Sequence, residues 1–281
     1  MNIVSTLDEL RLARNKLLNP LGLVPTMGAI HEGHLSLIRR AREECKSIAV
    51  SIFVNPTQFA PSEDLEAYPR DLDHDLMLLE KEGVDLVWTP DAEELYPAQF
   101  QTWVEVDQLT KVLEGALRPG HFRGVTTIVS KLFNVFQPQK AYFGQKDAQQ
   151  TIVIQRMVQD LNYALEIVVC QTVREADGLA MSSRNAHLDP EQRKAASVLF
   201  RALSAAKRVF NQGRHDADEL RRTMLDILGR EALAEVQYVS AADPKTLEEI
   251  EGAVETALLS TAVIFGKTRL IDNMIVKDDK G

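Results

Sequence analysis

The segment LGLVPTMGAIHEGHLSLIRRA, residues 21–41, decides the fold. It opens with a short apolar run, and from Leu35 onward its apolar residues recur at the spacing of a helix with one buried face. Between these runs, PTMGAIHEGH at 25–34 brings together two histidines, two glycines and a methionine. We therefore expect a buried strand, a loop and an amphipathic helix. In an α/β protein such a loop lies at the carboxyl edge of the sheet, where ligands usually bind.

The alternation of strand-like and helix-like runs continues to about residue 172. The predicted strands cover residues 47–54, 84–89, 141–143 and 165–172. The predicted helices between them cover residues 71–82, 125–136 and 147–161. Such alternation favours parallel strands joined by crossover helices, so the N-terminal part is expected to be an α/β domain with a Rossmann-like parallel sheet.

The pattern changes after Asp189. Asp189-Pro190 is typical of a helix start, and one long helix is expected to run to a turn near residues 211–213, with a second helix from about Ala217. Three strands follow, at 236–240, 257–265 and 269–276, and the short segment between the last two predicts an antiparallel hairpin. We expect a smaller α+β domain here, giving domains 1–175 and 176–281.

Composition limits the classes of function. The chain has 281 residues, enough for two domains, and 45% of them are hydrophobic and 26% charged, as in ordinary globular proteins. A net charge of −9 argues against a broad nucleic-acid-binding surface, so an anionic ligand must meet local positive charge. The N-terminal residues resemble neither a signal peptide nor a membrane span, which predicts a cytoplasmic protein without a membrane partner. Cys45 and Cys170 lack metal-ligand spacing and are expected to be buried thiols.

The opening loop is a candidate anion site. Gly28 and Gly33 allow close backbone approach or positive φ, and His31 and His34 would face the same way at a helix start, where N–H groups and the dipole attract anions. Alternatively, the histidines are incidental loop residues. Zinc binding is a third reading, which fits poorly because His-Glu-Gly-His lacks the i,i+4 histidine spacing.

Two further stretches offer polar groups. In FVNPTQF, residues 53–59, Asn55 begins either a simple turn or a site in which Gln58 makes neutral contacts to a small polar substrate. In EGALRPGHFRGV, residues 114–125, Arg118, His121 and Arg123 cluster before an apolar helix. That cluster is either a solvated face or part of the ligand edge.

The stretch YFGQKDAQQ, residues 142–150, passes from a strand into a helix. Lys146 can hold a phosphate there, while Asp147 can either cap the helix or bond a ribose hydroxyl. In GLAMSSRN, residues 178–185, two hydroxyls accompany Arg184, which can stabilise charge on a departing pyrophosphate. Together the stretches supply cations for phosphates, glycines for close approach and glutamines for a neutral substrate.

Taken in order, PTMGAIHEGH, FVNPTQF, RPGHFRGV, FGQKDAQQ and DGLAMSSRN resemble the pantothenate synthetases, the pantoate–β-alanine ligases. The similarity spans essentially the whole chain. Its HxGH and MSSR segments resemble the two signature motifs of the nucleotidyltransferase superfamily, which includes class I aminoacyl-tRNA synthetases. HxGH alone indicates the superfamily, whereas the full set is specific to the family.

The resemblance implies a reaction in which ATP and (R)-pantoate form pantoyl adenylate and pyrophosphate, and the amine of β-alanine then gives pantothenate and AMP. Mg²⁺ is expected with ATP, mainly on phosphate oxygens, without a named protein ligand. The family also implies a homodimer, and the second domain is expected to act as a lid over the adenylate. Two rival readings stay open at this point: another adenylyl-transferring enzyme that leaves AMP on its product, and a nucleotide sensor without catalysis.

The resemblance also implies roles for particular residues. The implied ATP-binding residues are Met27, Gly28, His31, Gly33, His34, Gly144, Gln145, Lys146, Asp147, Val173, Met181, Ser182, Ser183 and Arg184. The implied catalytic set is His31, His34 as proton donor, Lys146 and Arg184. The implied substrate contacts are Gln58 and Gln150 to pantoate, with Asn55 and Arg118 beside them. Gln145 stands where many family members carry Glu.

Overall fold

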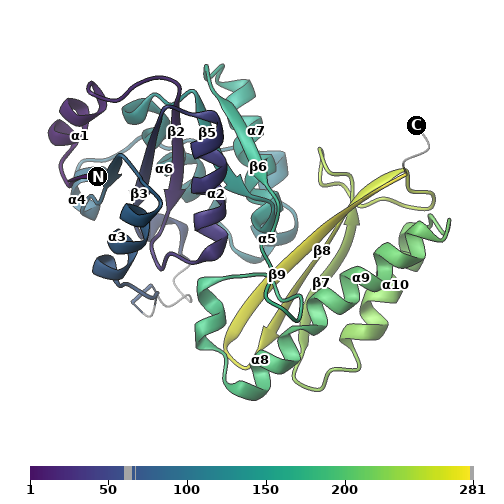
Figure 1. The fold of residues 1–281 in the computed structure, drawn as a ribbon. Helices are drawn as coiled ribbons and strands as arrows, with labels where there is room; N and C mark the ends of the chain where they lie inside the picture. Colours follow the sequence, from purple (N-terminus) through teal and green to yellow (C-terminus); the bar gives the residue numbers. More distant parts are fainter. Residues whose placement is uncertain (60–64, 67, 279–281) are drawn as a thin grey trace. The chain divides into compact units, whose positions relative to one another are not determined.

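The computed structural model of the chain describes residues 1–59, 65–66 and 68–278. The chain divides into two compact units, drawn in Figure 1. The first comprises residues 1–145 and 149–171, and the second comprises residues 146–148 and 172–281. The short segment 146–148 therefore belongs to the second unit, although its neighbours in the chain on both sides belong to the first.

The first unit is built on a six-stranded sheet in the order β1-β4-β3-β2-β5-β6, and its neighbouring strands are paired in parallel. Its strands are β1 (Asn2–Val4), β2 (Leu21–Thr26), β3 (Ser47–Ile52), β4 (Leu86–Trp88), β5 (Lys140–Gly144) and β6 (Glu166–Cys170). The predicted α/β class is confirmed. The order reverses between β2 and β5, so the carboxyl end of β2 lies at the switch point, where open α/β sheets bind ligands.

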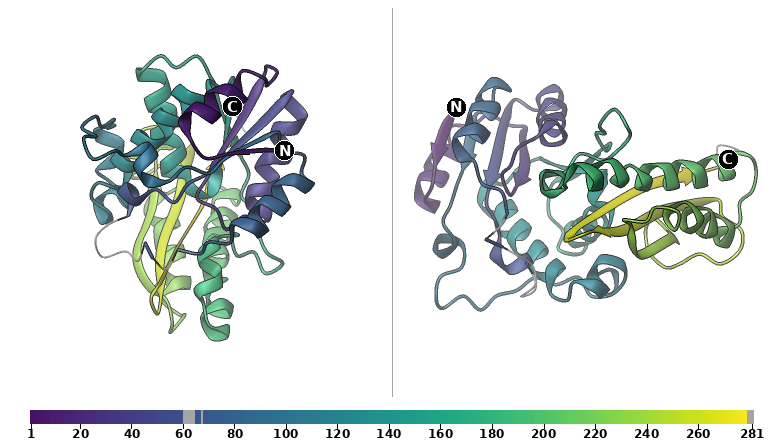
Figure 2. Two further views of the ribbon diagram at one scale, coloured as in Figure 1. Left: turned by 90° about the vertical axis from the view of Figure 1, so that its left-hand side faces the viewer. Right: turned by 90° about the horizontal axis from the view of Figure 1, so that it is seen from below.

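Helices cover both faces of this sheet (Figures 1 and 2). They are α1 (Leu7–Arg14), α2 (Glu32–Glu44), α3 (Leu72–Lys81), α4 (Ala92–Leu95), α5 (Leu113–Leu117), α6 (His121–Phe136) and α7 (Ala148–Asp160). On one face, Ile38 of α2 and Leu79 of α3 are fully buried in a cluster with the strands. On the other, Phe136 of α6 meets the Trp88 ring of β4 edge-on, with ring centroids 5.9 Å apart.

The second unit is α+β. Its antiparallel sheet has the order β7 (Glu235–Ala242), β8 (Thr256–Phe265), β9 (Thr268–Lys277). Its helices are α8 (Pro190–Ala196), α9 (Val198–Asn211) and α10 (Ala217–Leu228). Leu203 of α9, Leu220 of α10 and Leu259 of β8 are fully buried in one core. The predicted hairpin is confirmed, with Phe265 paired to Thr268 across the turn.

Two helix predictions were wrong in detail. The long helix expected from Asp189-Pro190 is split at Ser197, whose hydroxyl donates to the Lys194 carbonyl at 3.0 Å while its backbone N–H bonds the Ala195 carbonyl. Side-chain bonding of this kind competes with the regular helix pattern. Helix α6 begins at His121, four residues before the predicted start, because Gly120 adopts φ 85° as its N-cap.

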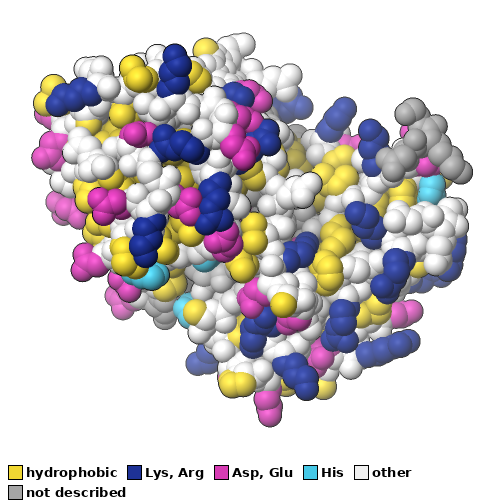
Figure 3. All heavy atoms as spheres, viewed as in Figure 1, with side chains coloured by type: hydrophobic (Ala, Val, Ile, Leu, Met, Phe, Trp, Pro, Cys, Tyr) yellow, Lys and Arg dark blue, Asp and Glu magenta, His cyan; other side chains and the backbone are white. Residues whose placement is uncertain are grey.

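The surface view in Figure 3 shows Lys and Arg side chains alongside Asp and Glu side chains on the face drawn, rather than a continuous field of one sign. Among the helices of the described residues, none is long and apolar enough to cross a bilayer.

Candidate active site

One buried carboxylate accepts hydrogen bonds from the backbone of the loop after β2. Asp75 of α3 accepts the backbone N–H of Ala29 at 2.9 Å and that of Ile30 at 2.7 Å. Gly28 and Ala29 both have positive φ, 83° and 51°. A Cβ on Gly28 would lie 3.0 Å from Asp75 Oδ2 and 3.3 Å from Ile52 Cγ2. Close packing and a left-handed backbone therefore both favour glycine at position 28.

Asp75 was missed by the sequence analysis. Its side chain is 2% exposed, and burial raises the pKa of its carboxyl, while the two backbone N–H bonds oppose that shift. The sequence did hold a signal, because Asp75 lies four residues before the fully buried Leu79 and so on the inward face of its helix. An acidic residue at such a position needs hydrogen-bond donors inside the fold.

His31 and His34 lie together at the start of α2. His31 is the N-cap, and its Nδ1 accepts the backbone N–H of Gly33 at 3.1 Å, while His34 Nδ1 accepts the backbone N–H of His31 at 3.4 Å. The ring centroids are 4.1 Å apart. Since both Nδ1 atoms are acceptors, each neutral imidazole carries its proton on Nε2. Two imidazole N–H donors thus accompany the positive end of a helix, which is an anion-binding arrangement.

Asn55 and Gln58 form a second polar group close to this loop. Asn55 caps a short 3₁₀ turn, η1 (Pro56–Gln58), and its Nδ2 donates to Gln58 Oε1 at 3.2 Å and to the Gly124 carbonyl at 3.1 Å. Gln58 Nε2 lies 2.7 Å from Met27 Sδ. Both side chains are buried, at 1% and 9% exposed. The structure therefore joins the β2 and β3 loops through Met27 and Gln58.

The turn before α6 also reaches Gln58. His121 Nδ1 lies 2.7 Å from the Gln58 carbonyl, and Arg118 Nη1 lies 3.1 Å from His121 Nε2. Because Arg118 is a donor only, His121 accepts through Nε2 and donates through Nδ1. Arg123 lies elsewhere, with its guanidinium over the Trp103 ring at 4.9 Å. Of the three basic residues in this stretch, two approach Gln58 and one does not.

Neighbouring glutamines at the start of α7 have different surroundings. The amide of Gln149 is buried, accepts the backbone N–H of Glu114 at 2.9 Å and donates to the carbonyls of Leu109 and Val112. Gln149 therefore braces the segment before α5. Gln150 is half-buried, and no side-chain hydrogen bond within the described residues involves it.

Residues Gly144 to Asp147 span the boundary between the units. Gly144 ends β5, and a 3₁₀ turn, η3 (Gln145–Asp147), leads into α7. The Lys146 side chain is 16% exposed, and its Nζ lies 3.8 Å from Asp147 Oδ1. The Lys146 carbonyl accepts a hydrogen bond from Asn273 Nδ2 on β9 at 2.8 Å.

The segment from Val173 to Arg184 lies within the second unit and forms a short hairpin followed by a 3₁₀ turn, η4 (Ser183–His187). Met181 N–H donates to the Val173 carbonyl at 3.0 Å, and the Ser182 hydroxyl accepts the Arg184 N–H at 3.3 Å. Ser183 is half-buried, as is Arg184. The guanidinium of Arg184 has no hydrogen bond or ion pair to any residue that the structure describes.

These features define a class, the doubly wound α/β proteins with an anion-binding helix start at the switch point of the sheet. A sequence model of the Pantoate-beta-alanine ligase family matches residues 2–275. This chain belongs to the pantoate–β-alanine ligase family.

Relatives and solved structures agree with that assignment. The chain is 57% identical over 277 residues to a pantothenate synthetase of Roseiflexus sp. (strain RS-1), covering 99% of this chain and 100% of the relative. The pantothenate synthetase of Thermus thermophilus superposes with a TM-score of 0.95 at 48% identity, over 99% of this chain and 100% of that one. The Francisella tularensis ligase, solved with beta-gamma ATP and beta-alanine, gives a TM-score of 0.82 at 33% identity, over 98% and 97% of the chains.

Proposed function

We propose that this protein is an ATP-dependent ligase that condenses (R)-pantoate with β-alanine to pantothenate, a precursor of coenzyme A, through a pantoyl-adenylate intermediate. The observation that carries the proposal is the pair His31 and His34 at the start of α2, at the switch point of a chain that matches the ligase family over residues 2–275.

The chemistry requires activation before condensation. A carboxylate is a poor acyl donor because its oxygen is a poor leaving group. In the first step the pantoate carboxylate attacks the α-phosphorus of ATP, and the bond from that phosphorus to pyrophosphate breaks. In the second step the amine of β-alanine attacks the acyl carbon, the bond to AMP breaks, and the amine loses a proton.

Residues of the first unit bind both substrates in this proposal. His31 and His34 hold the triphosphate through Nε2–H, and His34 is the proton donor; their Nδ1 atoms are occupied by backbone N–H groups, which fits this role. Gln58 and Gln150 bind pantoate, with Asn55 and Arg118 as further substrate contacts. The remaining proposed ATP contacts in this unit are Met27, Gly28, Gly33, Gly144 and Gln145.

Residues of the second unit hold the phosphates. Lys146 and Arg184 stabilise charge on the departing pyrophosphate, an effect that counts most in the transition state. The guanidinium of Arg184 makes no ion pair with any carboxylate among the described residues, which supports this role. The other proposed ATP contacts of this unit are Asp147, Val173 on the adenine side, Met181, Ser182 and Ser183.

The two domains have different roles in this proposal, and the chemistry of the intermediate explains why. We assign ATP and pantoate binding to a domain of residues 1–175, which includes Lys146, and a lid function to residues 176–281, which add the ATP contacts from Met181 to Arg184. An acyl adenylate reacts readily with water, so it must be shielded until the amine arrives. A second domain that carries phosphate-binding residues and closes when they engage ATP would provide that shield.

Mg²⁺ belongs to this proposal as a companion of ATP. No group of three or more His, Cys, Asp or Glu side chains suited to hold a metal occurs in the part of the chain that the structure describes. Mg²⁺ prefers oxygen ligands and often keeps several waters while bound to substrate phosphates. ATP itself is therefore the natural carrier of the ion, and its chemical contribution is to neutralise phosphate charge.

Two attributes of the protein in the cell complete the proposal. The ligase is a homodimer, as the family resemblance implies, and it acts in the cytoplasm, where ATP is available. Light scattering coupled to gel filtration tests the first, with a mass near twice the 31.5 kDa of the chain as the expected result. A monomer at assay concentration would contradict it.

An omission experiment tests the function. The protein is mixed with ATP, Mg²⁺, pantoate and β-alanine, and AMP and pantothenate are measured with each component left out in turn. We expect both products only in the complete mixture, and pyrophosphate exchange into ATP that requires pantoate but not β-alanine. Exchange without pantoate would indicate a different adenylyl-transferring enzyme, and ATP binding without turnover would indicate a sensor.

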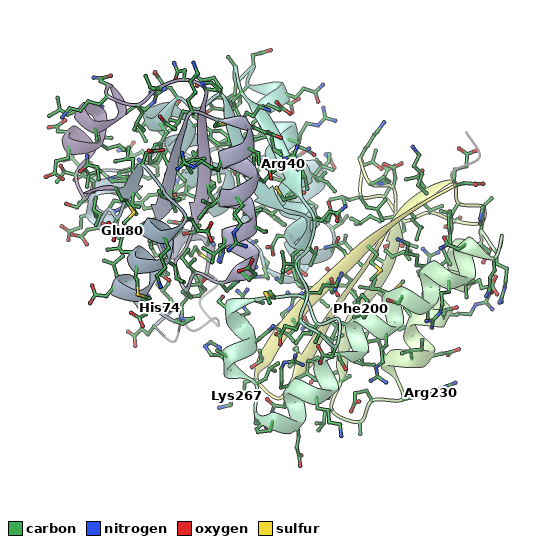
Figure 4. All side chains as sticks on the ribbon, viewed as in Figure 1. Arg40, His74, Glu80, Phe200, Arg230 and Lys267 are labelled. Atoms are coloured by element: carbon green, nitrogen blue, oxygen red, sulfur yellow. The ribbon has the colours of Figure 1, made fainter. Side chains whose placement is uncertain are left out.

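Variants assign the chemistry to the site. His34→Ala should lower pantoate-dependent exchange on the order of 10²-fold or more, because a preorganised donor is lost. His74 of α3, exposed and labelled in Figure 4, offers the matched control. His74→Ala should leave exchange unchanged. Equal losses in both variants would exclude the proposed role of His34.

A further inference from the structure

We propose that Asn273 of β9 is a positioning residue for Lys146, so that a single strand of the second unit sets both Lys146 and the Val173–Arg184 segment. The inference rests on the proposed function, in which Lys146 and Arg184 both act on the triphosphate. It adds a residue outside the proposed contacts to ATP, pantoate and β-alanine, one that acts through Lys146.

The contact between Asn273 and Lys146 is direct. Asn273 Nδ2 donates to the Lys146 carbonyl at 2.8 Å, and Asn273 itself is 4% exposed. The two residues are separated by 127 positions in the chain, yet the segment 146–148 groups with the second unit and not with β5 or the rest of α7. The hydrogen bond thus ties this short segment to β9.

The neighbouring residue on β9 holds the other phosphate-binding segment. Asp272 accepts two hydrogen bonds from the guanidinium of Arg174, at 2.6 and 3.0 Å, and is 2% exposed. Arg174 also donates to the Gly178 carbonyl at 3.0 Å and to the Asn273 carbonyl at 3.4 Å. A bidentate pair of this kind fixes orientation as well as distance.

The Val173–Arg184 segment is also stabilised by packing against Phe200. The Arg174 guanidinium lies 4.8 Å from the ring centroid of Phe200 on α9, which is labelled in Figure 4. A Cβ on Gly178 would lie 2.0 Å from that ring, so Phe200 packs against bare backbone at the tip of the hairpin. Because successive side chains of a strand point to opposite faces, Asp272 and Asn273 reach two different segments from adjacent positions.

A fixed backbone at Lys146 matters because the lysine side chain is long and flexible. Anchoring its carbonyl limits the directions from which the side chain extends, and so reduces the ordering needed when Nζ meets a phosphate. The carbonyl of Lys146 would also lose this donor if Asn273 were truncated. We therefore expect truncation to weaken adenylation more than the later amide-forming step.

The first experiment separates the two half-reactions. Asn273→Ala should lower pantoate-dependent pyrophosphate exchange at least 10-fold, with less than a 3-fold effect on conversion of supplied pantoyl adenylate and β-alanine to pantothenate. Ser260→Ala is the matched control, because Ser260 is paired with Asn273 across the sheet and is buried, with no hydrogen bond to its hydroxyl among the described residues. It should leave both steps within 2-fold of the parent.

The second experiment asks whether Asn273 acts through Lys146. In a double-mutant cycle, Asn273→Ala should lower exchange less than 2-fold further once Lys146→Ala is present, because its route of action is gone. If the fold-loss of exchange in the double variant equals the product of the fold-losses in the two single variants, the inference is overturned. Unimpaired exchange in Lys146→Ala alone would instead overturn the proposed role of Lys146.

Thermal melting checks that the variants are folded at the assay temperature. If Asn273→Ala melts below it, Asn273→Leu, which fills the buried space with an apolar side chain and has no donor, takes its place in both experiments. Equal impairment of both half-reactions by the folded variant would also contradict the inference, since a general loosening of the second unit predicts that result.

Discussion

Asp75 shows how one buried side chain sets the backbone of the candidate ATP-binding loop. Asp75→Asn keeps the size of the side chain but places an amide N–H₂ against the N–H of either Ala29 or Ile30, which each donate to a carboxylate oxygen. We expect the affinity for ATP to fall about 10-fold, the equivalent of one hydrogen bond to a charged group. Calorimetric titration with ATP measures it.

The control for this variant lies on the same helix. Asp73 is exposed on α3, so Asp73→Asn removes the same charge without touching the loop. It should bind ATP as the parent does. Parent-like affinity in Asp75→Asn would show that the loop keeps its conformation without the carboxylate.

Asp75 also gives a pH prediction. Burial raises the pKa of its carboxyl in the folded protein, so the ionised form is the costly one. At pH below the unfolded pKa of about 3.9 the group is neutral in both states and carries no such cost. As pH rises through the higher folded pKa, the parent loses stability that Asp75→Asn does not lose. Urea unfolding at pH 4 and pH 7 measures the free energy of unfolding of both proteins. The free energy of unfolding of Asp75→Asn should be higher, relative to that of the parent, at pH 7 than at pH 4. The same difference at both pH values would contradict this.

At the scale of elements, Arg193 of α8 fastens the hairpin before the Ser182–Arg184 segment. Its guanidinium bonds Glu175 at 2.5 Å and Asp177 at 2.6 Å, and these bonds to Arg193 hold the pKa of the Asp177 carboxyl below its usual range. The stabilisation is present above the unfolded pKa and is lost as pH falls through the lower folded pKa.

Arg193→Gln should cost about 0.5–1 kcal/mol of unfolding free energy at pH 7, since the partners are partly exposed. The difference should shrink as the pH is lowered through about 4 toward 3, where the carboxyls take up protons. Urea unfolding across this range measures it. Lys194→Gln, one position further and exposed, removes the same charge and should show no comparable pH-dependent loss.

Element by element, local chemistry explains what the sequence could predict. Asp189-Pro190 starts α8 as expected, because the carboxylate caps the first N–H groups and proline suits the first turn. Gly83 follows α3 with φ 73°, the left-handed conformation that glycine allows. Strand β1 was not predicted, because it has only three residues and one buried side chain, too short for a periodic signal.

At the scale of the whole molecule, the contacts between distant elements could not be predicted from local sequence patterns. That Asn273 bonds Lys146, or that Asp75 bonds the loop after β2, depends on which distant elements pack together. Motif spacing indicated the candidate residues, including His31 and His34, whose rings the structure brings into contact. Spacing gave no sign that the segment 146–148 groups with the C-terminal sheet or that Asn273, 127 positions away, donates a hydrogen bond to it, because both depend on the tertiary fold.

The proposed lid gives a prediction for the whole molecule. The proposed ATP contacts are divided between the units, with His31 and His34 in the first and Lys146 and Arg184 in the second, so a bound nucleotide favours the arrangement in which both sets engage. The proposed pantoate contacts, Gln58 among them, all lie in the first unit. Small-angle X-ray scattering with a non-hydrolysable ATP analogue should therefore show a smaller radius of gyration, whereas saturating pantoate alone should leave it unchanged. Superimposable scattering curves with and without the saturating analogue would rule out closure, because a lid that does not move cannot gate the adenylate.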